Sequence, residues 1–417
     1  MTATATTETT AGVLDRQALV DRFDLSALTP DFYRDPYPWY HALRELQPVK
    51  RMQNGSYFLT RYDDVMAVYK NPKVFSSDKH AEFGPKYGDT PLFRHHTTSL
   101  VFNDPPLHTR VRRLIAGALT PRAIAGMEAG LVTLVAQLLD RIEAKGDADL
   151  IEDFASAIPI EVIGNLLAVP HDERAPLRDW SLAILGALEP VLTPQAAGRG
   201  NAAVTEFSAY LEDLIARRRR APGDPAHDVL TRLIEGEEGG ERLTPAELLH
   251  NCIFLLNAGH ETTTNLIGNG LVALHDNPAQ KSRLLADPEL IRPAIEEVLR
   301  YESSNQLGNR ITTETVEIGG VLMPPQTQVT VCIGAANRDP AQFPDPDRFD
   351  IGRTPNRHVA FASGIHQCAG MNLARLEGRI ALSAFLARFP DFALAGPPVR
   401  GGRARFRGFL EIPARIR

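Results

Sequence analysis

Apolar residues recur with helical spacing along most of this chain. Positions three and four residues apart repeat over long segments, which are residues 120–145, 155–169, 201–220, 245–275, 288–301 and 370–389. Alternation of apolar and polar positions, the pattern of half-buried strands, is confined to short runs. These runs are residues 57–60, 314–318, 329–333 and 409–412. The pattern predicts a mainly α (α+β) fold with small sheets between helices, rather than a doubly wound sheet.

One of the helical segments has unusually clear ends. Thr244 and Glu247 form a capping box with Pro245 at the first helical position, and Pro278 must end the helix. Between these signals, about 32 residues at 1.5 Å each give a helix of roughly 48 Å. Its middle is apolar nearly all round, so we expect this helix to be buried in the core.

Composition and charge narrow the class of protein. The 417 residues are 43% hydrophobic and 23% charged, and the net charge is −6, which is typical of a folded chain and argues against generic nucleic-acid binding. The arginine run over 217–220 is interpreted as a solvated helix end. No uncharged stretch is long enough to span a bilayer, and the start lacks the apolar segment of a secretory signal. We therefore expect a cytoplasmic protein with no membrane and no nucleic-acid partner.

The chain shows no internal repeat and no long linker. Its start is rich in Thr, Ala and Glu and offers nothing to bury, so we expect residues 1–20 to form a mobile tail and residues 21–417 a single domain. Cys252, Cys332 and Cys368 are too few and too far apart for a disulfide framework or a zinc site.

Cys368 has the most informative surroundings. Glycines on either side allow a tight turn, and the amphipathic helix that follows would present free N–H groups to a thiolate. A lone cysteine is an inert core residue, a nucleophile or a metal ligand. The surrounding pattern, Phe361-x-x-Gly364-x-His366-x-Cys368-x-Gly370, resembles the haem-binding loop of the cytochrome P450 superfamily.

This resemblance implies a fold and a cofactor. The chain would adopt the cytochrome P450 fold, a helical bundle around haem b (iron protoporphyrin IX), with Cys368 as the metal ligand and Gly370 in the turn beside it. Phe361 would pack under the iron–sulfur bond, and His366 would reach a haem propionate. A thiolate ligand donates electron density that favours O–O cleavage.

A second motif, Ala258-Gly259-His260-Glu261-Thr262, lies midway along the long helix. Gly259 weakens the helix where Thr262 can bond back to a carbonyl, which favours a local bulge. Taken alone, the motif is a polar interruption of a core helix, although burying a carboxylate without a task is costly. It resembles the oxygen-binding groove of the same family, in which Ala258 and Gly259 leave room over the haem. Glu261 and Thr262 would then deliver protons.

Two further motifs match the family. Glu297 and Arg300 share a helix face and resemble the E-x-x-R pair, whose third member, an arginine in a proline-rich meander, would be Arg348. We expect this triad to be buried and structural rather than catalytic. His108 and Arg112 are four residues apart and could hold an anion, although a surface pair is the alternative. In the family such a pair binds the haem propionates, and His366 and Arg310 would add to it.

The resemblance covers the chain from about residue 30 to its end and implies a haem-thiolate monooxygenase. Such an enzyme inserts one atom of O₂ into a small to medium apolar substrate. Electrons would come from a separate ferredoxin and ferredoxin reductase, so NAD(P)H would act only indirectly. Four arginines flank the thiolate side and could attract an acidic ferredoxin: Arg110, Arg113, Arg353 and Arg357. A monomer is the family default.

Family topology places several side chains near the substrate. The apolar ones are Phe83, Phe93, Phe254 and Leu307. The polar ones, which could recognise an oxygen function or a carboxylate, are Arg94, His95, His96, Asn257 and Gln306. A small aromatic acid, a terpenoid and a larger natural product all stay open as substrates.

Two other functions are compatible with the same cofactor. One is a peroxygenase, or a biosynthetic oxidase that forms unsaturation or ring bonds; the pair Glu261 and Thr262 favours O₂ activation over obligate use of peroxide. The other is a haem sensor or carrier without turnover, which would need neither this pair nor a ferredoxin site.

Overall fold

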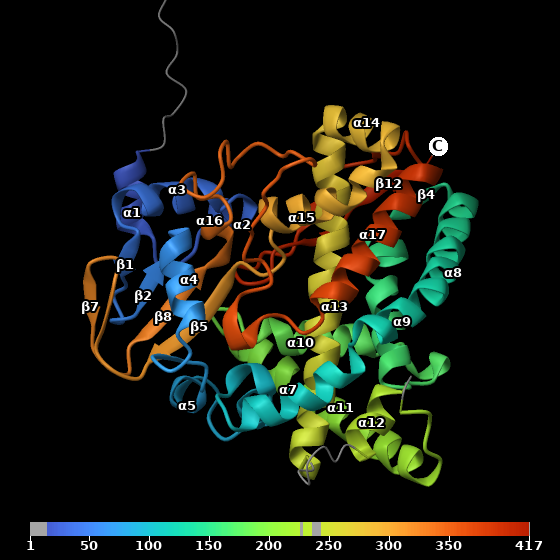
Figure 1. Cartoon of the computed structure of the whole chain (residues 1–417), viewed down its shortest axis with the longest axis horizontal. Helices are drawn as coiled ribbons and strands as arrows, with labels where there is room; N and C mark the ends of the chain where they lie inside the picture. The colour runs from blue at the N-terminus through green and yellow to red at the C-terminus, as the bar shows by residue number, and fades with distance from the viewer. Residues whose placement is uncertain (1–14, 226–227, 236–242, 417) are drawn as a thin grey trace, which may run out of the picture.

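The computed structural model describes residues 15–225, 228–235 and 243–416. Within these ranges, helices make up most of the molecule, and the largest sheet lies to one side of them (Figure 1). The helix α13 runs through the middle of the view in Figure 1, between that sheet and the helices of the opposite side. The predicted mainly α (α+β) class with small sheets is confirmed.

The helices begin and end as follows. Those of the first half of the chain are α1 (Arg16–Arg22), α2 (Pro30–Arg34), α3 (Tyr37–Leu46), α4 (Tyr62–Lys70), α5 (His80–Tyr87), α6 (Pro91–Thr98), α7 (Leu107–Ala118), α8 (Pro121–Lys145), α9 (Ala157–Leu166) and α10 (Leu177–Gly186). Those of the second half are α11 (Pro194–Arg220), α12 (Val229–Glu235), α13 (Pro245–Asp276), α14 (Pro278–Ala286), α15 (Ile291–Tyr301), α16 (Ile333–Ala336) and α17 (Met371–Arg388).

The strands form one five-stranded sheet and three smaller ones. They are β1 (Val49–Arg51), β2 (Tyr57–Leu59), β3 (Phe75–Ser76), β4 (Asp147–Asp149), β5 (Leu307–Thr312), β6 (Val316–Ile318), β7 (Val321–Met323), β8 (Gln328–Cys332), β9 (Ala393–Leu394), β10 (Val399–Arg400), β11 (Phe409–Glu411) and β12 (Pro413–Arg415). The order in the largest sheet is β1-β2-β8-β5-β3. The β2–β8 pair is parallel, and the other pairs of that sheet are antiparallel.

The long central helix is the element that the sequence predicts best. Thr244 and Glu247 exchange both hydrogen bonds of the capping box, at 2.8 and 3.2 Å, and α13 ends at Asp276, just before Asn277 and Pro278. Its C-terminal half is buried on nearly every face. The ends therefore follow from capping chemistry and proline, and the burial follows from the apolar pattern.

The predicted N-terminal tail is too long. α1 begins at Arg16, where Asp15 caps it by accepting from the N–H of Gln17, and Val20 is completely buried. Val20 packs with Phe23 in a small cluster that also contains residues of β2, β5 and β8. These partners come from distant parts of the chain, which is why composition near the start did not indicate them. Residues 1–14 lie outside the described part of the chain.

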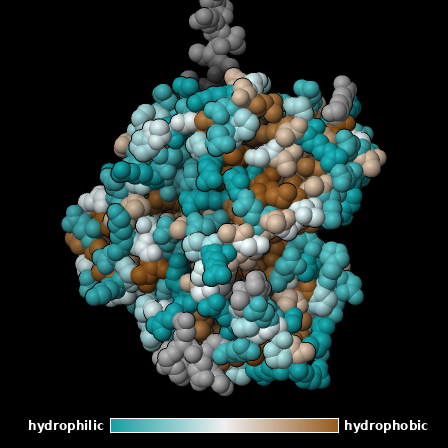
Figure 2. Space-filling model, turned by 45° about the vertical axis from the view of Figure 1, so that its right-hand side comes forward, coloured by the Kyte–Doolittle hydropathy of each residue, from teal (hydrophilic) through white to brown (hydrophobic). Residues whose placement is uncertain are grey.

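One helix in the described ranges, α8, is long and apolar enough to cross a membrane by length and composition, with a hydropathy of 1.4. Only 28% of this apolar segment of α8 is buried inside the protein. The inward positions of α8, Leu131, Val135, Leu138 and Ile142, belong to the main hydrophobic core. Figure 2 turns the α8 side of the molecule forward: polar residues cover most of this face, and apolar residues lie in patches between them.

Candidate active site

A cavity of about 350 Å³ lies between the middle of α13 and the loop that precedes α17. Phe361 and Cys368 line it from the loop, and Ala258 and Thr262 line it from α13. Most other side chains around it are apolar, and many of them come from η1 (Leu100–Phe102), α9 and α10. Two motifs from distant parts of the sequence therefore form walls of one space.

The cysteine loop makes a tight turn. Gly364 has a φ of 71°, and a Cβ atom at this position would lie 2.3 Å from the carbonyl oxygen of Tyr69, so only glycine fits. The N–H of Cys368 donates to the carbonyl of Phe361 at 2.9 Å. Gly370 is the N-cap of α17, so Cys368 precedes a helix N-terminus, as predicted.

The Cys368 thiol faces the cavity instead of the core. Cys368 is exposed, whereas Cys252 and Cys332 are buried. The surface that it exposes lines the cavity, so its surroundings are still mostly protein. Burial therefore raises the pKa of the thiol, and the N–H of Gly370 and nearby guanidinium groups offset part of that rise. A metal bound to the sulfur would favour the thiolate outright.

Four basic side chains gather beside this loop. The rings of His108 and His366 are 4.1 Å apart, and no nitrogen of either ring has a hydrogen-bond partner. Arg112 donates to the carbonyl of Gln367 at 2.6 Å, and Arg310 lines the same cavity. Burial and the neighbouring guanidinium groups lower the pKa of His108 to about 4 and that of His366 to about 2. The two imidazoles therefore lack both charge and partners in the protein alone.

These residues fit a haem. Two carboxylates placed among them would accept hydrogen bonds from the imidazoles and neutralise the two guanidinium groups. The sulfur of Cys368 lines the same cavity and is a ligand suited to iron. The structure thus brings together the residues that the sequence predicts for the propionates: His108, Arg112, Arg310 and His366.

On α13, Ala258, Gly259 and Thr262 line the cavity. The hydroxyl of Thr262 donates to the carbonyl of Ala258 at 2.6 Å, as expected. The predicted bulge is wrong, because α13 continues through this segment as regular α-helix; the hydroxyl shares the carbonyl without displacing a backbone bond. A Cβ atom on Gly259 would lie 2.5 Å from Cδ1 of Ile163, so this glycine also lets α9 approach α13 closely.

Glu261 does not line the large cavity, because consecutive residues of a helix point in different directions. It lines a separate cavity of about 30 Å³ together with His260, Asn265 and Arg403. Arg403 pairs with one carboxylate oxygen of Glu261, and the other oxygen has no partner. Burial raises the pKa of the Glu261 carboxyl to about 7, and Arg403 offsets part of that rise. The predicted acid–alcohol pair therefore occupies two faces of α13.

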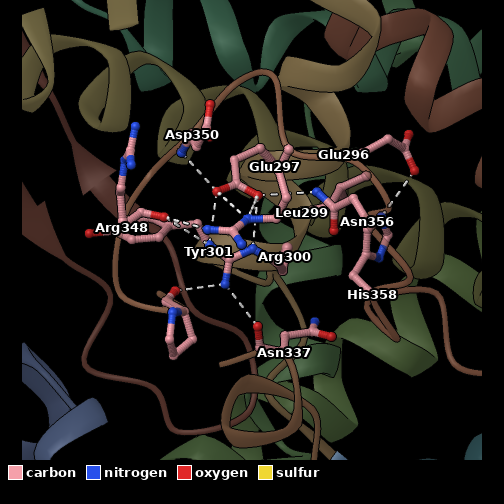
Figure 3. A network of polar contacts seen from close by, with 12 residues as sticks. Glu296, Glu297, Leu299, Arg300, Tyr301, Asn337, Arg348, Asp350, Asn356 and His358 are labelled. Atoms are coloured by element: carbon pink, nitrogen blue, oxygen red, sulfur yellow. Dashed lines mark hydrogen bonds and ion pairs between the residues drawn. The ribbon is translucent and has the colours of Figure 1, made fainter. Parts of the chain in front are cut away.

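The buried charge cluster behind the cysteine loop differs from the prediction in one member. Glu297 and Arg300 are fully buried, with 2.8 Å between Oε2 and Nε (Figure 3). Arg348 is exposed and contributes only its carbonyl, which accepts from Arg300 at 3.2 Å. The third cation is Arg353, whose Nε lies 3.2 Å from Oε2 of Glu297. In an irregular meander, sequence spacing does not show which arginine turns inward.

The structure places some of the predicted substrate residues in the cavity wall and others elsewhere. The predicted residues that line the cavity are Phe83, Phe254, Asn257 and Leu307. His95 and His96 line it too. His96 has no partner on either nitrogen, and the amide of Asn257 has none on either atom. Away from the basic residues beside the cysteine loop, the cavity wall is mostly apolar. Of its further charged side chains, Lys79 pairs with Glu82 and Arg405 donates to Asn309.

Three predicted substrate residues lie elsewhere. On α6 the buried side chains include Leu92, His95 and His96, so Phe93 packs beside His80 at the edge and Arg94 is exposed and pairs with Asp89 at 3.4 Å. Gln306 is buried and donates to the carbonyl of Ser303 at 2.7 Å. Because side chains alternate along an extended segment, Leu307 faces the cavity and Gln306 faces away from it.

The sequence motifs do not include Glu377, although it belongs to the site. This residue of α17 is 2% exposed, lines the cavity, and has one carboxylate oxygen without a partner. Burial raises the pKa of its carboxyl to about 8. The signal was available, since Glu377 interrupts the apolar face of the 370–389 segment next to Leu373 and Leu376.

A helical fold with a cysteine loop, a basic cluster that fits two carboxylates and a threonine in one cavity is compatible with a haem-thiolate protein. A family model described as Cytochrome P450 matches residues 180–393. Cytochrome P450 107B1 of Saccharopolyspora erythraea is 40% identical over 410 residues, which cover 94% of this chain and 98% of the relative. The chain therefore belongs to the cytochrome P450 family and is an enzyme of that type.

Other relatives agree. The biotin biosynthesis cytochrome P450 of Bacillus subtilis is 35% identical, with 93% of this chain and 98% of the relative covered. A solved structure of P450BioI in complex with acyl carrier protein ligated to hexadec-9Z-enoic acid superposes with a TM-score of 0.87 at 34% identity. That match covers 93% of this chain and 99% of the solved one. Family membership implies a haem cofactor, redox partners and a small-molecule substrate.

Proposed function

We propose that this P450 is a haem b monooxygenase that inserts one atom of O₂ into a small to medium apolar substrate, with electrons from a separate ferredoxin and its reductase. The observation that carries the proposal is one cavity that is lined by Cys368 of the cysteine loop on one side and by Ala258 and Thr262 of α13 on the other. When bound, haem supplies the oxygen chemistry, and a thiolate ligand favours O–O cleavage. NAD(P)H would act only through the redox partners.

In this proposal, Cys368 holds the iron and Phe361 packs against the sulfur. The N–H of Gly370 bonds the sulfur. Ala258 has a small side chain and Gly259 has none, so they leave space on the wall of the cavity opposite Cys368. The carboxylates of the cofactor are held by His108, Arg112, Arg310 and His366.

Protons would reach the cavity through α13. The space beside Glu261 is about 30 Å³, room for about two water molecules. A carboxyl with a pKa of about 7 can both gain and release a proton near neutral pH. Glu261 would therefore take protons on the far face of α13, and Thr262 would present them on the cavity face.

We expect Thr262→Ala to reduce the product formed per NADH several-fold, because the cavity loses its hydroxyl.

We expect Glu261→Gln to lower turnover by about 100-fold, the lower end of what a positioned acid contributes. In the parent, coupling should fall as the pH rises through about 7, since the protonated carboxyl is then lost; in Glu261→Gln the profile should be flat. NADH consumption and product are measured together. Unchanged coupling in both variants would contradict this route.

Thr133→Ala is the matched control for the threonine change. Its hydroxyl makes the same kind of bond, to the carbonyl of Ala129 at 3.0 Å, on the exposed face of α8. This variant should couple like the parent.

The cavity favours a substrate that is largely apolar and carries a neutral oxygen function. Burial and nearby cations lower the pKa of His96 to about 3, so the imidazole is neutral at pH 7, as is the amide of Asn257. Both side chains need hydrogen-bond partners, and a hydroxyl or carbonyl supplies them without burying a charge. Arg94, the predicted partner for a carboxylate, is outside the cavity.

A ferredoxin would dock on the side of the cysteine loop. Two of the four predicted arginines are already engaged, since Arg110 pairs with Glu247 and Arg353 with Glu297. Arg113 and Arg357 are exposed and are the ones that can meet an acidic partner.

We expect the double change Arg113→Glu and Arg357→Glu to slow reduction by ferredoxin by about tenfold or more at low salt. Stopped-flow reduction at two salt concentrations measures this. The control is Arg51→Glu, an exposed arginine of β1, on the sheet at the left of Figure 1. Equal rates in all three proteins at low salt would rule out this docking face.

The proposed function is tested by reconstituting the holoenzyme with a ferredoxin, its reductase and NADH. A substrate is first found by screening for a low-to-high-spin shift with apolar alcohols and ketones, matched carboxylic acids and hexadec-9Z-enoic acid, the acyl group in the solved relative. Product that depends on O₂ and NADH supports the monooxygenase. Product only with added peroxide would identify a peroxygenase, and spin shifts without any product would identify a sensor.

A further inference from the structure

A second ion cluster lies beside the buried Glu297–Arg300 pair and faces the cysteine loop. Glu296 accepts from Nε and Nη2 of Arg375 at 2.7 and 2.8 Å, and its Oε2 lies 3.0 Å from Nε2 of His358. In Figure 3, Glu296 and His358 turn toward each other and away from Glu297 and Arg300. Two adjacent glutamates of α15 thus bind different parts of the chain.

The hydrogen bonds fix the state of the histidine. Nδ1 of His358 accepts the N–H of Ala360 at 3.3 Å, so Nε2 carries the proton and donates it to Glu296. The His358 side chain is 3% exposed. Glu296 is held as the anion, because the bonds from His358 and Arg375 bring the pKa of its carboxyl down to about 2 despite burial.

The cluster contacts the residue that packs against the thiolate. The guanidinium carbon of Arg375 lies 4.9 Å from the centre of the Phe361 ring, and the His358 ring lies 5.9 Å from the same ring. Phe361 in turn accepts the N–H of Cys368 at 2.9 Å. Arg375 also interacts electrostatically with the Cys368 sulfur. The cluster therefore touches the cysteine loop both by packing and by charge.

We propose that Glu296, His358 and Arg375 form a positioning cluster that fixes Phe361 beside the sulfur of Cys368 and sets the charge felt by the thiolate, and thereby the ease with which the bound iron is reduced. The inference rests on the proposed haem-thiolate function. It assigns no contact with substrate to these residues; they act through Phe361 and Cys368. In the parent, Arg375 and Glu296 cancel each other's charge.

The test uses opposite charge changes at one place. Arg375→Gln leaves the Glu296 anion uncompensated and should lower the equilibrium constant for one-electron reduction. Glu296→Gln leaves the Arg375 cation uncompensated and should raise it. We expect this equilibrium constant to change by about three- to tenfold in each direction, as for a unit charge in surroundings with an effective dielectric constant near 20. The measurement is a mediated equilibrium titration of the holoenzyme without ferredoxin, so docking plays no part.

The matched controls are an arginine one helical turn further along α17 and its glutamate partner on α8. Arg379 pairs with Glu128 of α8 at 2.6 Å, so Arg379→Gln and Glu128→Gln make the same charge changes away from the cysteine loop. Both variants should have the same equilibrium constant for one-electron reduction as the parent. Arg375→Lys keeps the positive charge. Its equilibrium constant for reduction should therefore equal that of the parent, although the two parallel hydrogen bonds to Glu296 are lost.

Opposite shifts, with the controls unchanged, support the cluster. Shifts in the same direction would reveal mere loss of structure and overturn it, as would equal shifts in the controls or no shift. The failure of the haem-thiolate assignment is separate: it appears as a parent whose reduced, carbon-monoxide-bound spectrum lacks the thiolate-type Soret band. If Arg375→Gln does not fold, the rise in Glu296→Gln and the parent value in Arg375→Lys decide the question.

Discussion

Cys368→Ser should abolish the long-wavelength Soret band of the reduced, carbon-monoxide-bound protein. A serine oxygen is a harder and weaker donor to haem iron than a thiolate. Turnover should fall by more than about 100-fold, which is the upper end of what the loss of an outer-shell partner alone costs. The measurements are the absorption spectrum, the haem content and the product formed in the reconstituted system.

The other two cysteines provide matched controls. Cys252 and Cys332 are buried, and neither lines the cavity that contains Cys368. Cys252→Ser and Cys332→Ser should keep the parent spectrum, at some cost in stability. If Cys368→Ser keeps the thiolate-type band, or if one of the controls loses it, the assignment of the iron ligand is wrong.

The second large effect is on stability, at Glu297. Its carboxylate meets Arg300 and Arg353, accepts the N–H of Asp350 at 2.9 Å, and accepts from the amide of Asn356 at 3.1 Å. Glu297→Gln leaves the fully buried cation of Arg300 without its counter-ion, which should lower the free energy of unfolding by about 3–5 kcal/mol. Urea unfolding followed by circular dichroism measures this.

Asp31→Asn is the control for that change. Asp31 pairs with Arg34 at 2.9 Å, but the side chains are 68% and 76% exposed, so losing the charge should cost at most about 1 kcal/mol. A similar small loss in Glu297→Gln would show that the buried cluster does not stabilise the meander.

Local chemistry made several features predictable. The ends of α13 follow from a capping box and a proline, and the turn before Cys368 follows from Gly364, whose φ of 71° favours glycine. The spacing of His108 and Arg112 on one helix face was likewise readable. In each case the deciding contacts lie within a few residues, or a side chain is excluded by backbone geometry.

Other features required partners from distant segments. Arg353, not Arg348, reaches Glu297 because the meander turns its side chains by packing rather than by a fixed period. Phe93, Arg94 and Gln306 are neighbours of cavity-lining residues in the sequence, but their side chains point away from the cavity. The reason is that the orientation of α6 and of the start of β5 depends on the segments against which these elements pack. Val20 belongs to the core through contacts with distant strands.

The sequence by itself determined the family, the iron ligand expected at Cys368 and the central helix, because short motifs and capping signals specify them. Only the tertiary structure decided that Glu261 and Thr262 serve different cavities, that Glu296 and Glu297 bind different partners, and which polar side chains enter the large cavity. These outcomes depend on the direction of each side chain within a packed interior. That direction is set by the volume and charge of neighbours far away along the chain.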